Sequence, residues 1–140
     1  MKKINKFSEL TQFISQIKDD SFGEWIVDRE NDGSPEHPIH FPYVNYSTTA
    51  RNLITAIYDY GNAHPEFEHT KYGAILKDYG IESPEKADVS SMDAKGVFAL
   101  LVGAVREERF CDGALLEYYE NGCILRWLER LAEIDYLSNL

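Results

Sequence analysis

Cysteine is scarce in this sequence, and its scarcity narrows the chemistry open to the protein. The 140 residues contain two cysteines, Cys111 and Cys123, which are twelve positions apart, and no Cys-x-x-Cys pair. Structural zinc sites commonly draw their ligands from such pairs, so no metal site of that kind is predicted. Because the first ten residues, MKKINKFSEL, do not resemble a secretion signal, we expect the two thiols to be free rather than joined in a disulfide.

The sequence also lacks a long hydrophobic run. Its longest uninterrupted apolar stretch, from Val97 to Val105, has nine residues. That is less than half of the roughly 20 residues that a membrane-spanning helix requires. We therefore expect a cytoplasmic protein that is not inserted in a membrane.

Basic residues are few. Lysine and arginine together number 14 against 24 aspartates and glutamates, for a net charge of −10, and residues 24–93 alone hold thirteen acids and five bases. Such an excess repels the phosphate backbone of nucleic acids, so direct nucleic-acid binding is not expected. It suits a basic protein partner, and it equally suits a solvated acidic surface that only keeps the protein in solution.

What the sequence does contain is typical of one globular domain. Hydrophobic residues make up 44% of the chain, which is enough for a core, and no repeat or low-complexity linker divides residues 1–140. Along much of the chain the apolar residues recur at the three-to-four spacing of a helix. These patterns predict a mainly α fold: a compact bundle of about five to six helices with a small β-hairpin near residues 24–43.

The hairpin is indicated by a local change of pattern. Trp25 and Val27, then Ile39, Phe41 and Tyr43, alternate with other residues on either side of the turn-rich stretch NDGSPEHP. Proline cannot donate a ladder hydrogen bond, and Pro38 precedes the second of these alternating stretches while Pro42 lies within it. We therefore expect the hairpin to be a weakly held edge of the fold.

Two helix starts carry recognisable signals. Ser47 or Thr48 is placed to cap the helix in YSTTARNLITAIYDYGNAH. Ser90 to Asp93 has the Ser-x-x-Asp form that often opens a helix. The helix that follows is apolar on every side over Val97–Val105, so we expect it at the centre of the core.

The densest stretch is REERFCDGALLEYYENGCILRWLERL, which begins at Arg106. It predicts two short helices, at about residues 112–120 and 123–136. Asp112 is placed to cap the first of them and to accept a hydrogen bond from Arg109 or Arg106. Alternatively, the two arginines form a fork that binds a phosphate beside the amides of the helix start. The first interpretation makes the corner architectural, and the second makes it a ligand site.

Other chemistries have weaker support. Cys111 lies near a basic residue and a helix start, both of which favour the thiolate, but no histidine is close in sequence to act as its base. The histidines lie in proline-broken loops without ligand spacing; they are His37, His40, His64 and His69. We therefore predict no metal, no cofactor and no catalytic residue.

Aromatic residues are plentiful, with nine tyrosines, seven phenylalanines and two tryptophans. Tyrosine and tryptophan dominate the hot spots of protein interfaces, so some of these rings could form a partner-binding patch. The candidates are Tyr43, Tyr46, Tyr118, Tyr119 and Trp127. The alternative is that they fill the core and satisfy their hydroxyl groups at its edge.

The dense corner also resembles a known family. Its pattern Arg-x-x-Arg-Phe-x-Asp-Gly, then Gly-x-Ile and Leu-x-x-Leu, is similar to that of small bacterial proteins known only as a domain of unknown function, as is the stretch FPYVNYS. The matching positions are Arg106, Arg109, Phe110, Asp112, Gly113, Gly122, Ile124, Leu128 and Leu131. Family members often have a histidine after the Asp-Gly where this chain has Ala114, which argues against catalysis. The resemblance implies a bacterial or mobile-element setting and no known activity.

Together these observations favour a non-enzymatic interaction or regulatory protein that acts through an acidic, tyrosine-bearing surface. The candidate binding residues are Arg106, Arg109, Asp112, Tyr43, Tyr46 and Trp127. One alternative is a small enzyme or ligand-binding protein that uses the arginine corner of Arg106, Arg109 and Asp112. Another is a structural subunit of a homo-oligomer. The expected partner is another protein or a second copy of the chain in a dimer.

Overall fold

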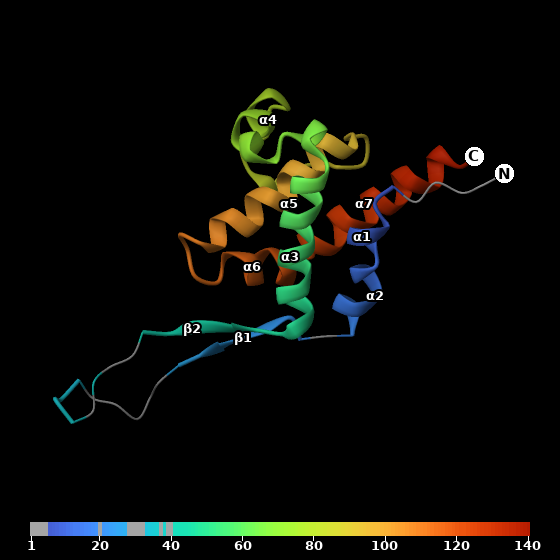
Figure 1. The fold of residues 1–140 in the computed structure, drawn as a ribbon. Helices are drawn as coiled ribbons and strands as arrows, with labels where there is room; N and C mark the ends of the chain where they lie inside the picture. Colours follow the sequence, from blue (N-terminus) through green and yellow to red (C-terminus); the bar gives the residue numbers. More distant parts are fainter. Residues whose placement is uncertain (1–5, 20, 28–32, 37, 39–40) are drawn as a thin grey trace.

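The computed structural model describes residues 6–19, 21–27, 33–36, 38 and 41–140. Within these ranges the chain forms a bundle of helices and a two-stranded sheet that projects from the bundle (Figure 1). The α-helices are α1 (Ser8–Thr11), α2 (Phe13–Lys18), α3 (Thr48–Ala63), α4 (Tyr72–Asp78), α5 (Ala94–Glu108), α6 (Ala114–Glu120) and α7 (Cys123–Ser138). Single 3-10 turns form η1 (Pro65–Phe67), η2 (His69–Lys71) and η3 (Pro84–Lys86). The mainly α fold with a small hairpin is confirmed.

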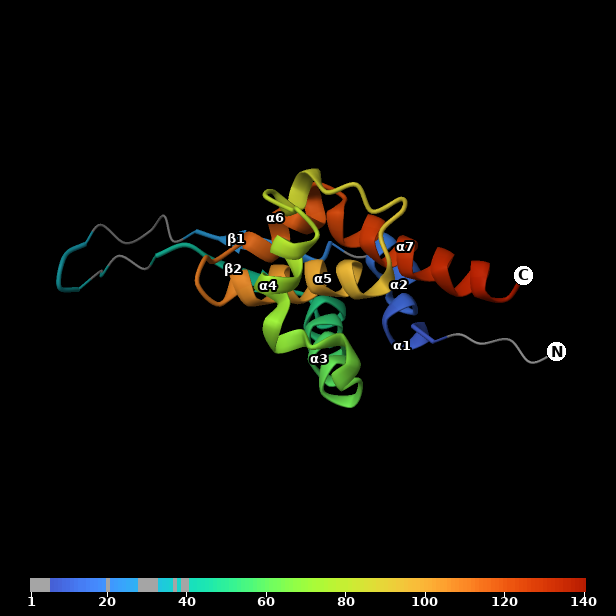
Figure 2. The same cartoon turned by 90° about the horizontal axis from the view of Figure 1, so that it is seen from above.

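Helix α5 is the centre of the bundle. It contacts α3, α4, α6 and α7, and from above it is seen between α3 and α7 (Figure 2). All of its residues over 96–102 are buried, as are Ala104 and Val105. Because neighbours cover the helix on several sides, its apolar residues are not confined to one stripe. The expectation of a central helix over Val97–Val105 is confirmed.

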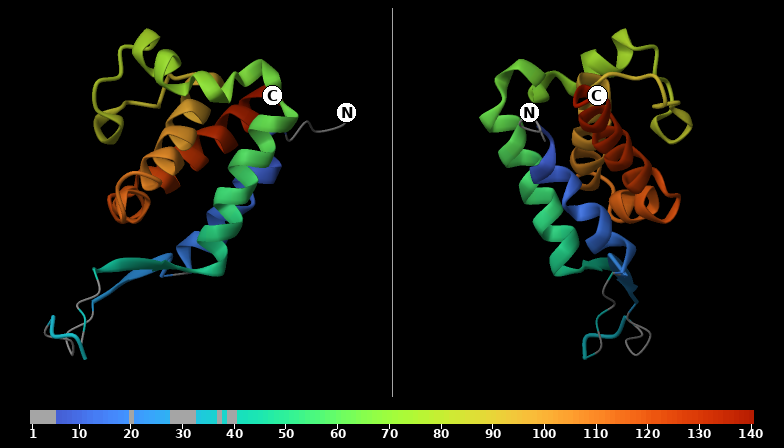
Figure 3. Two further views of the ribbon diagram at one scale, coloured as in Figure 1. Left: turned by 60° about the vertical axis from the view of Figure 1, so that its left-hand side comes forward. Right: turned by 90° about the vertical axis from the view of Figure 1, so that its right-hand side faces the viewer.

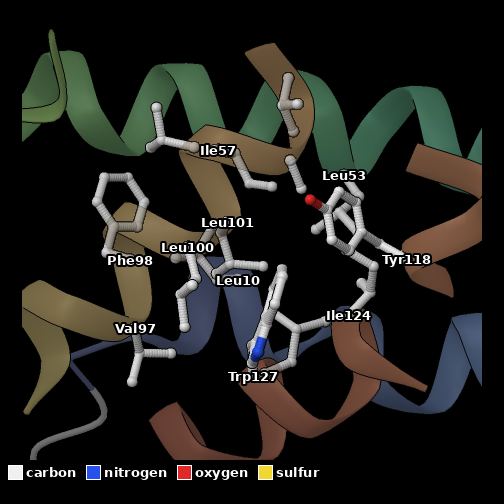
Figure 4. Packing of buried hydrophobic residues seen from close by; sticks show 14 of the residues in the cluster. Leu10, Leu53, Ile57, Val97, Phe98, Leu100, Leu101, Tyr118, Ile124 and Trp127 are labelled. Carbon is white, nitrogen blue, oxygen red and sulfur yellow. The ribbon is translucent and has the colours of Figure 1, made fainter. Parts of the chain in front are cut away.

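The other helices bury apolar residues against α5 or, in the case of α1 and α2, against α3 and α7. Trp127 of α7, Leu10 of α1 and Leu53 of α3 come together in the core, each at most 1% exposed (Figure 4). Ile124 and Leu128 of α7 have no exposed surface. Helix α7 therefore closes over the central helix, as its spacing predicts.

Short polar side chains set the starts of α3 and α5. The Ser47 hydroxyl accepts a hydrogen bond from the Ala50 amide at 3.1 Å, which confirms the cap expected there. Helix α5 is capped by Asp93, whose carboxylate accepts from the Gly96 amide at 3.1 Å. This helix therefore starts at the end of the Ser-x-x-Asp motif rather than at Ser90, which bonds to the carboxylate two residues before it.

Helix α7 also anchors the N-terminal segment. The carboxylate of Asp135 is buried and accepts hydrogen bonds from the amides of Lys6 and Phe7, both at 3.0 Å. A carboxylate remains charged in such a place only when donors replace its hydration. Asp135 thus ties the chain just before α1 to the last helix.

The sheet forms an arm, defined here as strands β1 (Gly23–Ile26) and β2 (Tyr43–Tyr46). The strands pair antiparallel, with Gly23 opposite Tyr46 and Trp25 opposite Val44. Figure 3 shows the arm extending beyond the helices. The predicted hairpin is confirmed; Ile39 lies outside the described residues. Among the described helices, none is long and apolar enough to span a membrane.

Candidate functional site

Glu108 organises the corner between α5 and α6. It is the last residue of α5, and its carboxylate accepts hydrogen bonds from the Gly113 amide, at 3.1 and 3.2 Å, and from the Leu115 amide, at 3.0 Å. These amides belong to the first turn of α6, where no backbone carbonyl is available to them. The glutamate therefore caps α6 from the preceding helix, and its negative charge suits the positive end of the helix dipole.

Tyr46 connects this corner to the arm. Its hydroxyl donates a hydrogen bond to Glu108 and accepts one from the Leu116 amide at 3.1 Å. Burial, followed by the hydrogen bond to Glu108, raises the pKa of Tyr46 well above the ordinary value of a tyrosine. The hydroxyl therefore keeps its proton, and β2 is fixed to α5 and α6 through one shared network.

Trp25 attaches the other strand of the arm to the same corner. Gly113 has a φ of +91°, in the left-handed region. A Cβ atom built on it would lie 2.2 Å from Cζ2 of the Trp25 indole. Only glycine allows both this backbone conformation and the approach of the ring. The base of the arm is thus held by a contact on each strand.

The prediction that Asp112 caps α6 and holds an arginine is wrong. Asp112 is exposed, and it makes no hydrogen bond or ion pair with any residue that the structure describes. The residue at the cap position of α6 is Gly113, so Asp112 lies one position too early to reach the helix amides. Because the carboxylate of Glu108 already occupies those amides, a phosphate fork at this helix start is also unsupported.

The two arginines are not brought together with Asp112. Arg106 is half-buried and lines a cavity of about 180 Å³ beside Tyr58. Arg109 is exposed and lines a separate hollow of about 210 Å³, also beside Tyr58, with Ile54. The expected arginine corner is therefore not one site, and its two cations face different spaces.

The expected aromatic patch divides between core and surface. Trp127 is fully buried and Tyr118 is 6% exposed, so a partner cannot contact Trp127 in this structure. Tyr46 and Tyr119 are half-buried and hydrogen-bonded, with the Tyr119 hydroxyl donating to the Ile17 carbonyl at 3.1 Å. Tyr43 is the one member of the set with an exposed ring.

A different set of aromatic residues is exposed. Phe41 is 88% exposed, Phe110 85%, Tyr43 52% and Trp25 48%. Three of them lie in or beside the arm, and Phe110 lies in the α5–α6 corner on which the Trp25 indole rests. We call these four residues the arm–corner surface. Sequence reasoning missed Phe110 and Trp25 as surface residues, because an isolated aromatic carries no sequence signal of exposure.

Among the residues that the structure describes, the other candidate chemistries do not assemble into a site. Cys111 is exposed, Cys123 is buried, and both are free. His64 forms a pair with Glu66 at 3.3 Å and stacks on Tyr60. No group of three or more histidine, cysteine or acidic side chains placed to hold a metal occurs in the described parts of the chain. Of the remaining histidines, those at positions 37 and 40 lie outside those parts.

The fold and the corner define a helical domain whose hairpin arm is fixed to a capped helix corner. The chain belongs to the family described as "Family of unknown function (DUF6508)", whose family model matches residues 2–136. This agrees with the resemblance to a domain of unknown function. No curated protein and no solved structure is significantly similar to the chain.

Proposed function

We propose that the protein is a non-enzymatic interaction protein of the bacterial cytoplasm that binds a protein partner through the arm–corner surface. The observation that carries this proposal is the exposure of four large aromatic side chains on two adjoining segments. Exposed apolar surface of this kind is costly to leave in water, and aromatic residues are enriched where proteins bind one another. The packing of the bundle core does not require these four side chains to be exposed.

The arm is suited to binding because both of its strands contact the corner at the base. Tyr46 fixes β2 to Glu108, and the Trp25 indole rests on Gly113. A surface that is ordered before binding loses less conformational entropy when it meets its partner. The same corner that holds the arm also displays Phe110. Trp25 pairs with Val44 and Tyr43 with Ile26, so these two aromatic side chains lie on opposite faces of the arm, and the exposed rings surround the arm and the corner rather than share one face.

The acidic charge favours a basic protein surface as the partner. Glu24 on β1 and Asp112 in the corner are exposed acids beside the aromatic rings. The chain as a whole carries a net charge of −10. Opposite charges at the rim of an interface speed association and exclude wrong partners. The proposed partner therefore presents an apolar centre surrounded by lysine or arginine.

Self-association as a dimer is the second candidate. A two-fold dimer through the arm–corner surface would bring the same acids face to face, which disfavours it relative to a basic partner. Light scattering decides this point, because a monomer has a mass of 16.1 kDa. A concentration-dependent mass near twice that value would show that the surface binds a second copy of the chain rather than a basic protein.

The main test is site-specific photo-crosslinking in the host cell, followed by reconstitution. A photoreactive residue at position 110 should capture a defined basic protein, whereas the same residue at exposed position 136 on α7 should not. With the purified partner, Phe110→Ser should weaken binding at least tenfold, as expected for a hot spot, and Tyr136→Ser should leave it unchanged. Equal capture from both positions, or unchanged affinity of Phe110→Ser, would contradict the proposal.

A further inference from the structure

A second candidate binding site lies where α3, η2, α4 and α5 meet, on a part of the bundle that can be followed in Figures 1 and 3. It is a cavity of about 180 Å³. The residues that line it are Tyr58, His69, Thr70, Tyr72, Val102 and Arg106. All of them except Val102 carry a side chain that can donate a hydrogen bond.

Two polar atoms at this cavity are enclosed without a partner. The Tyr58 hydroxyl and Nε of Arg106 are both buried, and neither has a hydrogen-bond partner among the residues that the structure describes. A buried donor left without a partner costs roughly 1–3 kcal/mol, and more when the group is charged. Both residues line the cavity, so a small rotation of each side chain would bring its covered donor to a bound acceptor.

The charge of Arg106 is also not neutralised by the acids nearest to it in sequence. Glu107 accepts a hydrogen bond from the Tyr118 hydroxyl at 2.6 Å, and Glu108 accepts from the amides of α6. Beside η2, Glu68 forms ion pairs with two lysines, at 3.2 and 3.5 Å. Arg106 therefore has no acidic partner among the described residues, a property that it shares with Arg51, Arg109 and Arg126.

The wall of the cavity depends on a small residue in α3. A Cβ atom at Gly61 would lie 2.7 Å from Cγ of His69, so the absence of a side chain at position 61 lets η2 pack closely against the helix. Gly61 is buried in the last turns of α3, where glycine is otherwise less favourable than alanine by about 1 kcal/mol. The close approach places His69 and Thr70 at the same cavity as Arg106.

We infer that this cavity binds a small oxyanion, with the Arg106 guanidinium as its counter-charge and the Tyr58 hydroxyl as a second donor. Arginine offers a planar fork that matches the oxygens of phosphate or carboxylate. Several further donors line the cavity, which favours the larger number of acceptor oxygens on a phosphate group. The volume is below the roughly 300–1,000 Å³ of pockets for drug-sized ligands, so the ligand is inorganic phosphate or a small phosphomonoester rather than a nucleotide.

Calorimetric titration with inorganic phosphate, in a phosphate-free buffer near pH 7, tests the inference directly. The wild-type protein should bind one phosphate per chain. Arg106→Gln should lower the affinity at least tenfold, and Tyr58→Phe, which removes only the hydroxyl, should lower it several-fold. Arg109→Gln is the matched control: it lies on the same stretch of chain but outside the cavity, so its affinity should stay within twofold of wild type.

Two further variants separate binding from folding. Arg106→Lys keeps the positive charge but loses the planar fork, so it should fold normally and bind phosphate several-fold more weakly. Gly61→Ala should displace His69 and weaken phosphate binding. Its thermal midpoint, measured by circular dichroism, shows whether the variant is folded. If Arg106→Gln does not fold, Arg106→Lys and Tyr58→Phe carry the test.

A comparison of further ligands tests which kind of oxyanion the cavity binds. Methyl phosphate should bind as phosphate does, acetate should bind at least tenfold more weakly, and adenosine monophosphate should not bind more tightly than phosphate. Acetate binding as tight as phosphate would overturn the choice of phosphate. The inference as a whole fails if wild type does not bind phosphate at millimolar concentration, which would mean that water alone fills the cavity. It also fails if Arg106→Gln and Arg109→Gln lower the affinity for phosphate by the same factor.

Discussion

The two corners on either side of α6 use the same backbone device for different purposes. Gly113 before α6 and Gly122 before α7 both have a left-handed conformation, with φ of +91° and +79°. Around Gly122, a Cβ atom would meet nothing within 4 Å. Around Gly113, the indole of Trp25 occupies that space and the carboxylate of Glu108 receives the amides. One corner only reverses the chain, whereas the other assembles segments that are distant in sequence.

This difference separates the polar groups that hold the fold together from the side chains that remain exposed for binding. A helix start is a ready site for an external anion, but at α6 the protein supplies its own carboxylate. The polar network of the α5–α6 corner is therefore internal and holds the arm in place. The corner leaves Phe110 exposed, and Phe41 and Tyr43 are exposed just before and at the start of β2. These rings are where we expect contact with a partner.

The largest expected effect comes from removing the carboxylate at the first corner. Glu108→Ala leaves the amides of Gly113 and Leu115 and the Tyr46 hydroxyl without their shared acceptor. Hydrogen bonds to a charged group contribute about 1.5–3 kcal/mol each, and partial exposure reduces their sum, so the free energy of unfolding should fall by about 3–5 kcal/mol. Urea unfolding measures this loss.

Asp112→Ala is the control for that prediction. Asp112 is exposed and makes no hydrogen bond with a described residue, so its removal should change the free energy of unfolding by less than about 0.5 kcal/mol. The reverse order, with Asp112→Ala the more destabilising, would mean that the short aspartate caps α6 in solution after all.

The sequence predicted those parts of the fold that depend on local pattern. The Ser47 cap and the central helix each follow from residues a few positions apart. Glu108 could not be found in this way: the amides that it accepts from are five and seven positions away but belong to the next helix, and its third partner, Tyr46, is 62 positions away. Local cap preference favoured Asp112 instead. Only the tertiary placement of β2 makes the longer side chain the better acceptor.

One error could have been avoided from the sequence. Trp127 is a candidate binding residue by its aromatic type, with the core as the alternative, yet it belongs to the spacing 124, 127, 128, 131, which is one buried stripe of a helix. Its aromatic character suggested an interface, whereas its position indicated the core. The cavity at Arg106 is the opposite case, because no local pattern links Tyr58 on α3 to that arginine on α5.

The glycines before α6 and α7 give the next largest difference in the free energy of unfolding. Gly122→Ala should cost about 1–2 kcal/mol, the strain of a side chain in the left-handed region, because the space around it is open. Gly113→Ala carries the same strain and also displaces the Trp25 indole, which adds roughly 1–3 kcal/mol. Urea unfolding gives both values. Tryptophan fluorescence should shift in Gly113→Ala alone; the same shift in both variants would show that the indole does not rest on Gly113.

The smallest expected effect at neutral pH belongs to Tyr46→Phe, which should lower the free energy of unfolding by about 1 kcal/mol for the two hydrogen bonds it loses.

The larger effect of Tyr46→Phe is expected at alkaline pH. The pKa of Tyr46 is raised in the folded protein by burial and by Glu108, whereas an unfolded tyrosine titrates near 10. Above about pH 10 the unfolded chain therefore loses this proton while the folded chain keeps it, so stability falls as pH rises, by at most about 1.4 kcal/mol per pH unit for one group. Burial also raises the pKa of Tyr60 and Tyr118, so wild type should show a steeper total loss. Urea unfolding between pH 8 and 11 should find a shallower slope in Tyr46→Phe and an unchanged slope in Tyr136→Phe, which alters an exposed ring. Identical slopes in wild type and Tyr46→Phe would show that the tyrosine is not held by the corner.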